Sequence, residues 1–105
     1  MIEVRETDTF SDWLSGLRDT RARAEVARRV RRLALGNPGD GKPVGEGVSE
    51  LRIRYGPGFR VYFVQRGAVL VILLCGGDKS GQRREIAPAI RFAQGNWNDW
   101  SNPPP

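Results

Sequence analysis

The feature that most constrains the fold is an uninterrupted apolar run from Ala68 to Cys75. It is too short to cross a membrane as a helix, which needs about 20 apolar residues. A tight Arg-Gly turn precedes the run and two glycines, Gly76 and Gly77, follow it. This pattern is typical of a strand at the centre of a sheet, buried on both faces and broken by the glycine pair.

Two further strands are predicted directly before this run. Residues 50–55 alternate between charged and apolar side chains, which gives one apolar and one charged face. The Gly-Pro-Gly turn at 56–58 joins this strand to the next one, from Phe59 to Gln65. Because these turns are too short for a parallel crossover, we expect an antiparallel meander.

The N-terminal part of the chain predicts a strand over residues 2–6 and a helical hairpin. Thr7 or Asp8 is placed to cap the first helix, and Asp19 and Thr20 to end it and cap the second. The apolar stripe of the first helix consists of Phe10, Trp13, Leu14 and Leu17. That of the second consists of Val26, Val30 and Leu33, before a stop at Gly36. Residues 36–47 are rich in glycine and predict a mobile loop.

The expected fold class is α+β, with an N-terminal strand, a helical hairpin, an antiparallel β-meander and a C-terminal helix packed in layers. We expect one domain over residues 1–95 and a flexible tail over residues 96–105. The last helix would place Ile86, Ala89, Ile90 and Ala93 on its inner face.

The composition excludes several classes of chemistry. The chain contains no histidine and one cysteine, so a His-based triad, a His-ligated zinc site and a disulfide framework are excluded. We expect no metal and no cofactor. Lys and Arg outnumber Asp and Glu by 17 to 12, and the net charge of +5 favours a polyanionic partner. The N-terminus lacks an apolar signal-peptide core, which predicts a cytoplasmic protein with no membrane partner.

Three motifs resemble the phage-derived addiction-module killer proteins, which are HigB-like members of the RelE/ParE toxin superfamily. The motifs are Glu-Leu-Arg-Ile-Arg at 50–54, Gly-Pro-Gly-Phe-Arg-Val-Tyr-Phe at 56–63 and Leu-Leu-Cys-Gly-Gly-Asp-Lys-Ser-Gly-Gln at 73–82. The combination is fairly specific, and the resemblance covers about residues 2–94.

The resemblance implies the toxin of a type II toxin-antitoxin system. Many relatives are mRNA interferases that cut messenger RNA on the ribosome without metal, by attack of a 2′-hydroxyl on the adjacent phosphate. The implied partners are a cognate antitoxin of the helix-turn-helix kind, the ribosome and mRNA, with an oligomeric assembly of toxin and antitoxin. The ParE branch shares the fold but inhibits DNA gyrase without nuclease activity, so this alternative stays open.

The same resemblance implies three catalytic residues, Arg60, Lys79 and Arg54. Arg60 matches the strand arginine that relatives use against the scissile phosphate, a role suited to a guanidinium group. Its alternative is structural, as a partner of Glu50 or Asp78. We expect its replacement by alanine to leave thermal stability nearly unchanged if the catalytic role is correct.

Lys79 matches a second catalytic cation of the family. The alternative is that Lys79 is a turn residue paired with Asp78. Arg52 and Arg54 share a strand face and resemble basic residues that bind RNA or accept a proton, although an arginine stays protonated. The alternative is that Arg52 and Arg54 have no such role and only lie on a solvated face of the sheet. The further residues expected to bind RNA are Gln82, Arg83 and Arg84. The arginines at 28–32 are expected on a solvated or antitoxin-binding face.

Overall fold

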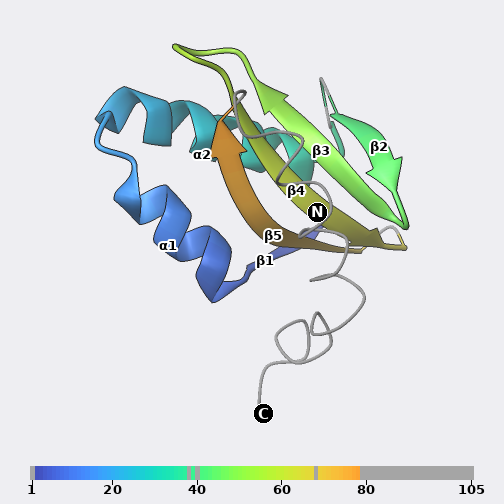
Figure 1. Ribbon diagram of the computed structural model, residues 1–105. Helices are drawn as coiled ribbons and strands as arrows, with labels where there is room; N and C mark the ends of the chain where they lie inside the picture. The colour runs from blue at the N-terminus through green and yellow to red at the C-terminus, as the bar shows by residue number, and fades with distance from the viewer. Residues whose placement is uncertain (1, 38, 40, 68, 79–105) are drawn as a thin grey trace.

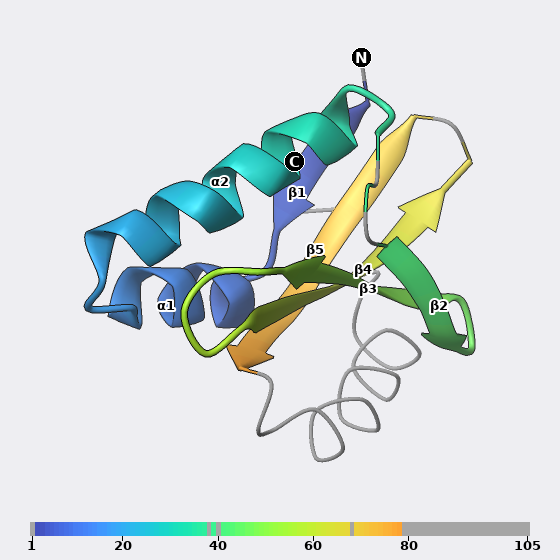
Figure 2. The same ribbon diagram turned by 90° about the horizontal axis from the view of Figure 1, so that it is seen from above.

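The computed structural model describes residues 2–78 apart from 38, 40 and 68. Its elements in chain order are β1 (Glu3–Glu6), α1 (Asp8–Gly16), α2 (Thr20–Ala34), β2 (Gly41–Gly45), β3 (Val48–Ile53), β4 (Phe59–Arg66) and β5 (Leu70–Asp78). In this part of the chain, both helices pack on one face of a five-stranded sheet (Figures 1 and 2). The predicted α+β class is confirmed. The predicted C-terminal helix and the tail over 96–105 lie outside the described residues.

The strands lie in the order β1-β5-β4-β3-β2. β3, β4 and β5 form the predicted antiparallel meander, whereas β1 pairs with β5 in parallel. The prediction that the apolar strand is buried on both faces is confirmed. Val71 and Leu73 of β5 join the core beneath the helices, Ile72 and Leu74 join a second cluster on the opposite face, and all four are fully buried.

Side-chain caps fix the N-terminal ends of both helices, as the sequence predicts. Thr7 Oγ1 accepts a hydrogen bond from Phe10 N at 3.0 Å and donates one to the Leu74 carbonyl of β5 at 2.6 Å. Asp19 caps α2, and Gly36 follows its end with a φ of 88°, a conformation that favours glycine. None of the helices in the described ranges is long and apolar enough to cross a membrane.

The expectation of a mobile loop over residues 36–47 is wrong for its second half. Residues 41–45 form β2, an edge strand that pairs antiparallel with β3. Pro43 is tolerated because an edge strand has one side without ladder hydrogen bonds, and the register shifts between Pro43 and Gly45. The high glycine content of this segment led to the prediction of a loop. The pairing of β2 with β3 places Lys42 opposite Glu50.

The expectation that Gly76 and Gly77 break the last strand is also wrong. β5 continues through both glycines to Asp78, with Gly77 opposite Arg60 of β4. A Cβ atom at position 76 would overlap the ring of Trp13, which lies on this part of the strand. Gly76 therefore serves the packing of α1 on β5, and not a turn.

This packing makes a testable prediction for Gly76→Ala. The added methyl group must displace the Trp13 ring from its place beside Phe10 and Phe59, so we expect the free energy of unfolding to fall by about 1–3 kcal/mol. Urea denaturation measures the change. Gly16→Ala is the matched control, because open space surrounds Gly16 in α1 and alanine favours the helix there. Equal stability of the two variants would contradict the packing role of Gly76.

Candidate functional site

A hollow of about 410 Å³ lies at the β3–β4 hairpin and is lined by residues 52–60. Gly56 and Gly58 adopt positive φ angles of 58° and 85°, and Gly58 N donates a hydrogen bond to the Tyr55 carbonyl at 2.9 Å. The Gly-Pro-Gly motif therefore closes a tight turn that side chains at these two positions would strain. The wall of the hollow includes Arg52, Arg54 and Arg60, three of the predicted site residues.

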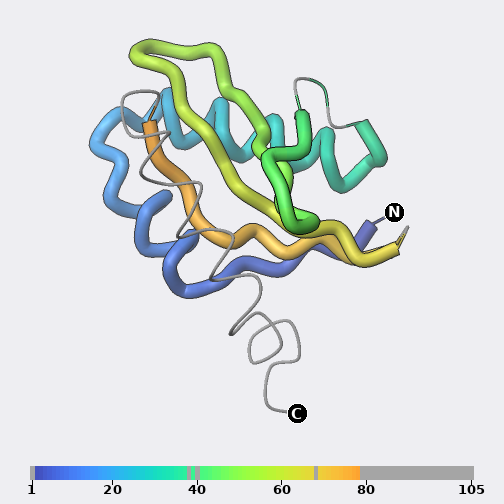
Figure 3. The backbone as a smooth tube through the Cα atoms, turned by 45° about the vertical axis from the view of Figure 1, so that its right-hand side comes forward, coloured from blue at the N-terminus to red at the C-terminus, as the bar shows by residue number. Residues whose placement is uncertain are grey.

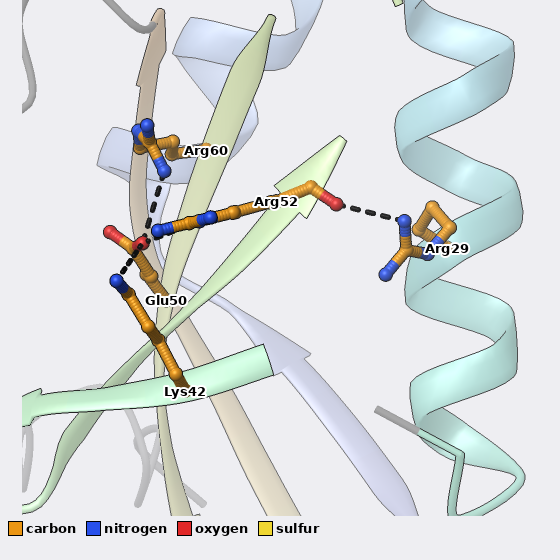
Figure 4. A network of polar contacts seen from close by, with 5 residues as sticks. All are labelled: Arg29, Lys42, Glu50, Arg52 and Arg60. Atoms are coloured by element: carbon orange, nitrogen blue, oxygen red, sulfur yellow. Dashed lines mark hydrogen bonds and ion pairs between the residues drawn. The ribbon is translucent and has the colours of Figure 1, made fainter. Parts of the chain in front are cut away.

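Arg52 and Arg60 are neighbours across the β3–β4 ladder. Both side chains contact the same atom, Glu50 Oε1, from Arg52 Nε at 3.1 Å and from Arg60 Nη1 at 3.0 Å (Figure 4). Lys42 Nζ of β2 reaches this oxygen at 4.0 Å. Three cations from three adjacent strands thus meet at one carboxylate oxygen, on the sheet face opposite the helices. We call Lys42, Glu50, Arg52 and Arg60 the Glu50 cluster.

The centre of the Glu50 cluster, Glu50 and Arg60, is withdrawn from water. Glu50 has a side-chain exposure of 0% and Arg60 of 9%, whereas Arg52 is 35% and Lys42 52% exposed. A buried carboxylate needs charged partners and hydrogen bonds to offset its desolvation, and here arginines supply both. Among the described residues, no group accepts a hydrogen bond from the buried Arg60 Nε. Within the described part of the chain, this one carboxylate faces three cations, so positive charge is in excess in the cluster.

The sequence left open whether Arg60 has a structural role. The structure shows one, because Arg60 pairs with Glu50 inside the protein. This contact argues against the expectation that Arg60→Ala leaves stability nearly unchanged, because the change leaves a buried carboxylate with fewer partners. Arg60 nevertheless also lines the hollow. Pairing with Glu50 and lining the hollow are compatible for one side chain.

Arg54 follows the last residue of β3, is exposed and lines the hollow with Arg60. The other predicted site residues, Lys79, Gln82, Arg83 and Arg84, lie outside the described residues. The described chain ends at Asp78, which stands opposite Phe59 in the β4–β5 ladder. Phe59 is itself part of the wall of the hollow.

Arg29 departs from the expected solvated or antitoxin-binding face of α2. Its side chain is buried, and Nη1 donates a hydrogen bond to the Arg52 carbonyl at 2.8 Å (Figure 4). Arg29 therefore connects the helical layer to the strand that carries Arg52. The neighbouring Arg28 is exposed and pairs with Glu25 on the same helix at 3.0 Å.

A second polar contact holds the hairpin that forms the hollow. Tyr55 Oη donates a hydrogen bond to Asp19 Oδ2 at 2.9 Å, so the β3–β4 turn lies beside the turn between α1 and α2 (Figure 3). This hydrogen bond from Tyr55 lowers the pKa of Asp19 below its ordinary value, and it raises the pKa of Tyr55. Arg21 lies over the Tyr55 ring at 5.6 Å.

Glu50 and Lys42 are the two members of the Glu50 cluster that do not appear among the predicted site residues. Glu50 is foreseen only as a partner of Arg60, and Lys42 falls in the segment predicted as a loop. An acidic residue within an otherwise basic strand was the available signal for Glu50. Within residues 2–78 as described, no group of three or more His, Cys, Asp or Glu residues could hold a metal ion.

The Tyr55–Asp19 contact predicts a pH dependence. The folded-state pKa of Asp19 lies below its ordinary value of 3.8, so the contact stabilises the fold fully above that pH and less as the pH falls through the folded-state pKa. The raised pKa of Tyr55 means that the stabilisation is also lost above about pH 10. The stability difference between wild type and Tyr55→Phe, measured by urea denaturation, should be constant near neutral pH and shrink at both extremes. A difference that is the same at all pH values would refute this role.

Comparisons with known proteins place the chain in a family. The family model described as phage derived protein Gp49-like (DUF891) matches residues 12–95. An uncharacterized protein of Haemophilus influenzae is 50% identical over 93 residues, which are 89% of this chain and 94% of that protein.

A solved structure supports the fold. One chain in the crystal structure of the toxin-antitoxin complex RelBE2 from Mycobacterium tuberculosis is similar with a TM-score of 0.52 and 23% identity. The match covers 74% of this chain and 98% of that one. The fold expected from the RelE/ParE resemblance is therefore confirmed. Because the family model spans most of its length, the chain belongs to the phage-derived Gp49-like family.

Proposed function

We propose that this protein is the toxin of a type II toxin-antitoxin system and that it cleaves mRNA on the ribosome without a metal ion. The observation that carries the proposal is the hollow at the β3–β4 hairpin, where Arg52, Arg54 and Arg60 share one wall. The Gp49-like family, the RelE/ParE motifs and the fold match to a chain of a toxin-antitoxin complex support it.

The proposed reaction is an in-line transfer within the RNA. The 2′-hydroxyl loses its proton as its oxygen attacks the adjacent phosphorus, the bond to the 5′-oxygen breaks and that oxygen takes up a proton. The products are a 2′,3′-cyclic phosphate and a 5′-hydroxyl. Negative charge grows on the phosphate oxygens in the transition state, so fixed cations beside them lower the barrier. A guanidinium group fits this task, because it stays charged and offers several donors in one plane.

In this proposal Arg60 stabilises the transition state at the scissile phosphate. The Glu50 contact fixes Nη1 of its guanidinium, so the group is oriented before RNA binds. Arg54, at the exposed rim, holds RNA beside it, and Arg52 contributes to the same positive surface. By the resemblance, Lys79 protonates the leaving 5′-oxygen, while Gln82, Arg83 and Arg84 bind the RNA backbone.

The proposal also includes the partners of such a system. A cognate antitoxin, encoded beside this chain and of the helix-turn-helix kind, would neutralise the toxin in a joint oligomeric assembly in the cytoplasm. The excess of basic residues favours both an RNA substrate and an acidic protein surface. Growth arrest on expression, relieved by co-expression of the neighbouring small gene, tests this part.

The test of catalysis is Arg60→Lys, because lysine keeps a positive charge beside Glu50 but loses the planar set of donors. We expect cleavage of mRNA on translating ribosomes to fall by about 100-fold or more, with a melting temperature close to that of wild type. Arg60→Ala should lose both activity and stability, since Glu50 stays buried with fewer partners.

Arg28→Lys is the matched control, because Arg28 is also paired with a glutamate but lies on α2, away from the hollow. Its cleavage rate should equal that of wild type. Codon-positioned cuts with 2′,3′-cyclic ends would support the proposal. Intact mRNA together with inhibited DNA gyrase would overturn it in favour of the ParE-like function.

A further inference from the structure

The Glu50 cluster contains a cation that the proposed catalytic site does not use. Lys42 approaches Glu50 from β2, at the edge of the sheet, while Arg60 approaches from β4. β3 lies between these two strands and carries Glu50 and Arg52. Figure 4 shows the side chains of Lys42 and Arg60 reaching the carboxylate from different sides.

The charge of the cluster favours a further anion. The Lys42, Arg52 and Arg60 cations all approach a single oxygen, Glu50 Oε1, and they repel one another there. At reduced exposure to water this repulsion is only partly screened, since the effective dielectric constant is well below that of bulk water. A phosphate group beside the cluster relieves the repulsion, which a further cation or an apolar ligand does not.

The positions of the cations indicate more than one phosphate. Arg60 is among the residues 52–60 that line the hollow, whereas Lys42 lies outside it on the edge strand β2. In the proposed function the scissile phosphate enters the hollow to meet Arg60, where Lys42 is not part of the wall. A phosphate held by Arg60 at the hollow is therefore a different one from a phosphate within reach of Lys42.

Lys42 is also free to move toward a ligand. Its side chain is 52% exposed, and its 4.0 Å approach to Glu50 Oε1 is at the outer limit of an ion pair. An exposed pair at this distance contributes little to stability, so exchanging the carboxylate for a phosphate has a small energetic cost. Arg60, at 9% exposure and 3.0 Å, is held far more firmly.

We propose that Lys42 is a further RNA-binding residue, which contacts a backbone phosphate next to the one at Arg60. The inference rests on the proposed function and extends its RNA-binding surface from the hairpin hollow across β3 to the edge strand β2. It concerns binding of the phosphodiester chain and not the chemical step.

The experiment measures binding of a fluorescent single-stranded RNA whose 2′-O-methyl groups prevent cleavage, by anisotropy over a series of salt concentrations. For Lys42→Met in the full chain we expect affinity to fall roughly three- to tenfold at low salt. The slope of log K against log salt should fall by about 0.7, the value for one lost phosphate contact on a single strand. Lys42→Arg should restore both quantities.

Arg28→Met is the matched control, because it removes the same charge from an exposed ion pair on the helical side of the molecule. It should leave the slope unchanged, and both variants should melt near the wild-type temperature. Equal effects of Lys42→Met and Arg28→Met, an unchanged slope in Lys42→Met, or no RNA binding by wild type would each overturn the inference. RNA binding that depends on Lys42, without cleavage on ribosomes, would overturn the proposed nuclease and leave this inference standing.

Discussion

The contact between the buried carboxylate of Glu50 and its surrounding cations is the interaction on which the candidate site depends. It joins β2, β3 and β4 through side chains, on the face of the sheet opposite the helices. Without that carboxylate, Arg60 would be a nearly buried cation with no counter-charge from this contact, a costly arrangement. Glu50 therefore allows a guanidinium group to be fixed at the wall of the hollow, which in the proposed function is where it meets a phosphodiester already oriented.

Contacts on the other face of the sheet connect its strands to the helices. Arg29 connects α2 to the Arg52 carbonyl, and Tyr55 connects the hairpin to Asp19 at the start of α2. Trp13 packs closely on β5 where Gly76 leaves room for its ring. The hollow is thus supported by contacts with the helical layer as well as by the strand ladder, which suits a site whose cations must not shift as charge develops.

Local patterns in the sequence predicted most of the fold. The run from Ala68 to Cys75 identified the doubly buried strand, and the caps at Thr7 and Asp19 located the two helices. The errors came from glycines, whose local signal is ambiguous. Gly76 and Gly77 continue a strand that pairs with β4, with Trp13 of α1 packed on Gly76, and Gly41 and Gly45 belong to an edge strand paired by β3. Contacts between segments that are far apart in the sequence decided these cases, and a short segment of the sequence does not reveal such contacts.

The sequence predicted the arginines of the candidate site but not how these residues are arranged. The family motifs identified Arg52, Arg54 and Arg60, and the structure brings all three to one hollow. The convergence of Lys42, Arg52 and Arg60 on one oxygen depends on the register of three strands, which a single sequence does not specify. For the same reason, the sequence suggested a structural role for Arg60 as an alternative to the catalytic role but could not decide between them.

The most direct test of the Glu50–Arg60 contact is a double-mutant cycle between Glu50→Gln and Arg60→Met, with the free energy of unfolding measured by urea denaturation. If Glu50 and Arg60 hold each other in place, the two changes should be non-additive, with a coupling energy of about 1.5 kcal/mol or more. Effects that add to within about 0.5 kcal/mol would show that the two side chains are independent, and would contradict the central role of the Glu50 carboxylate in the site.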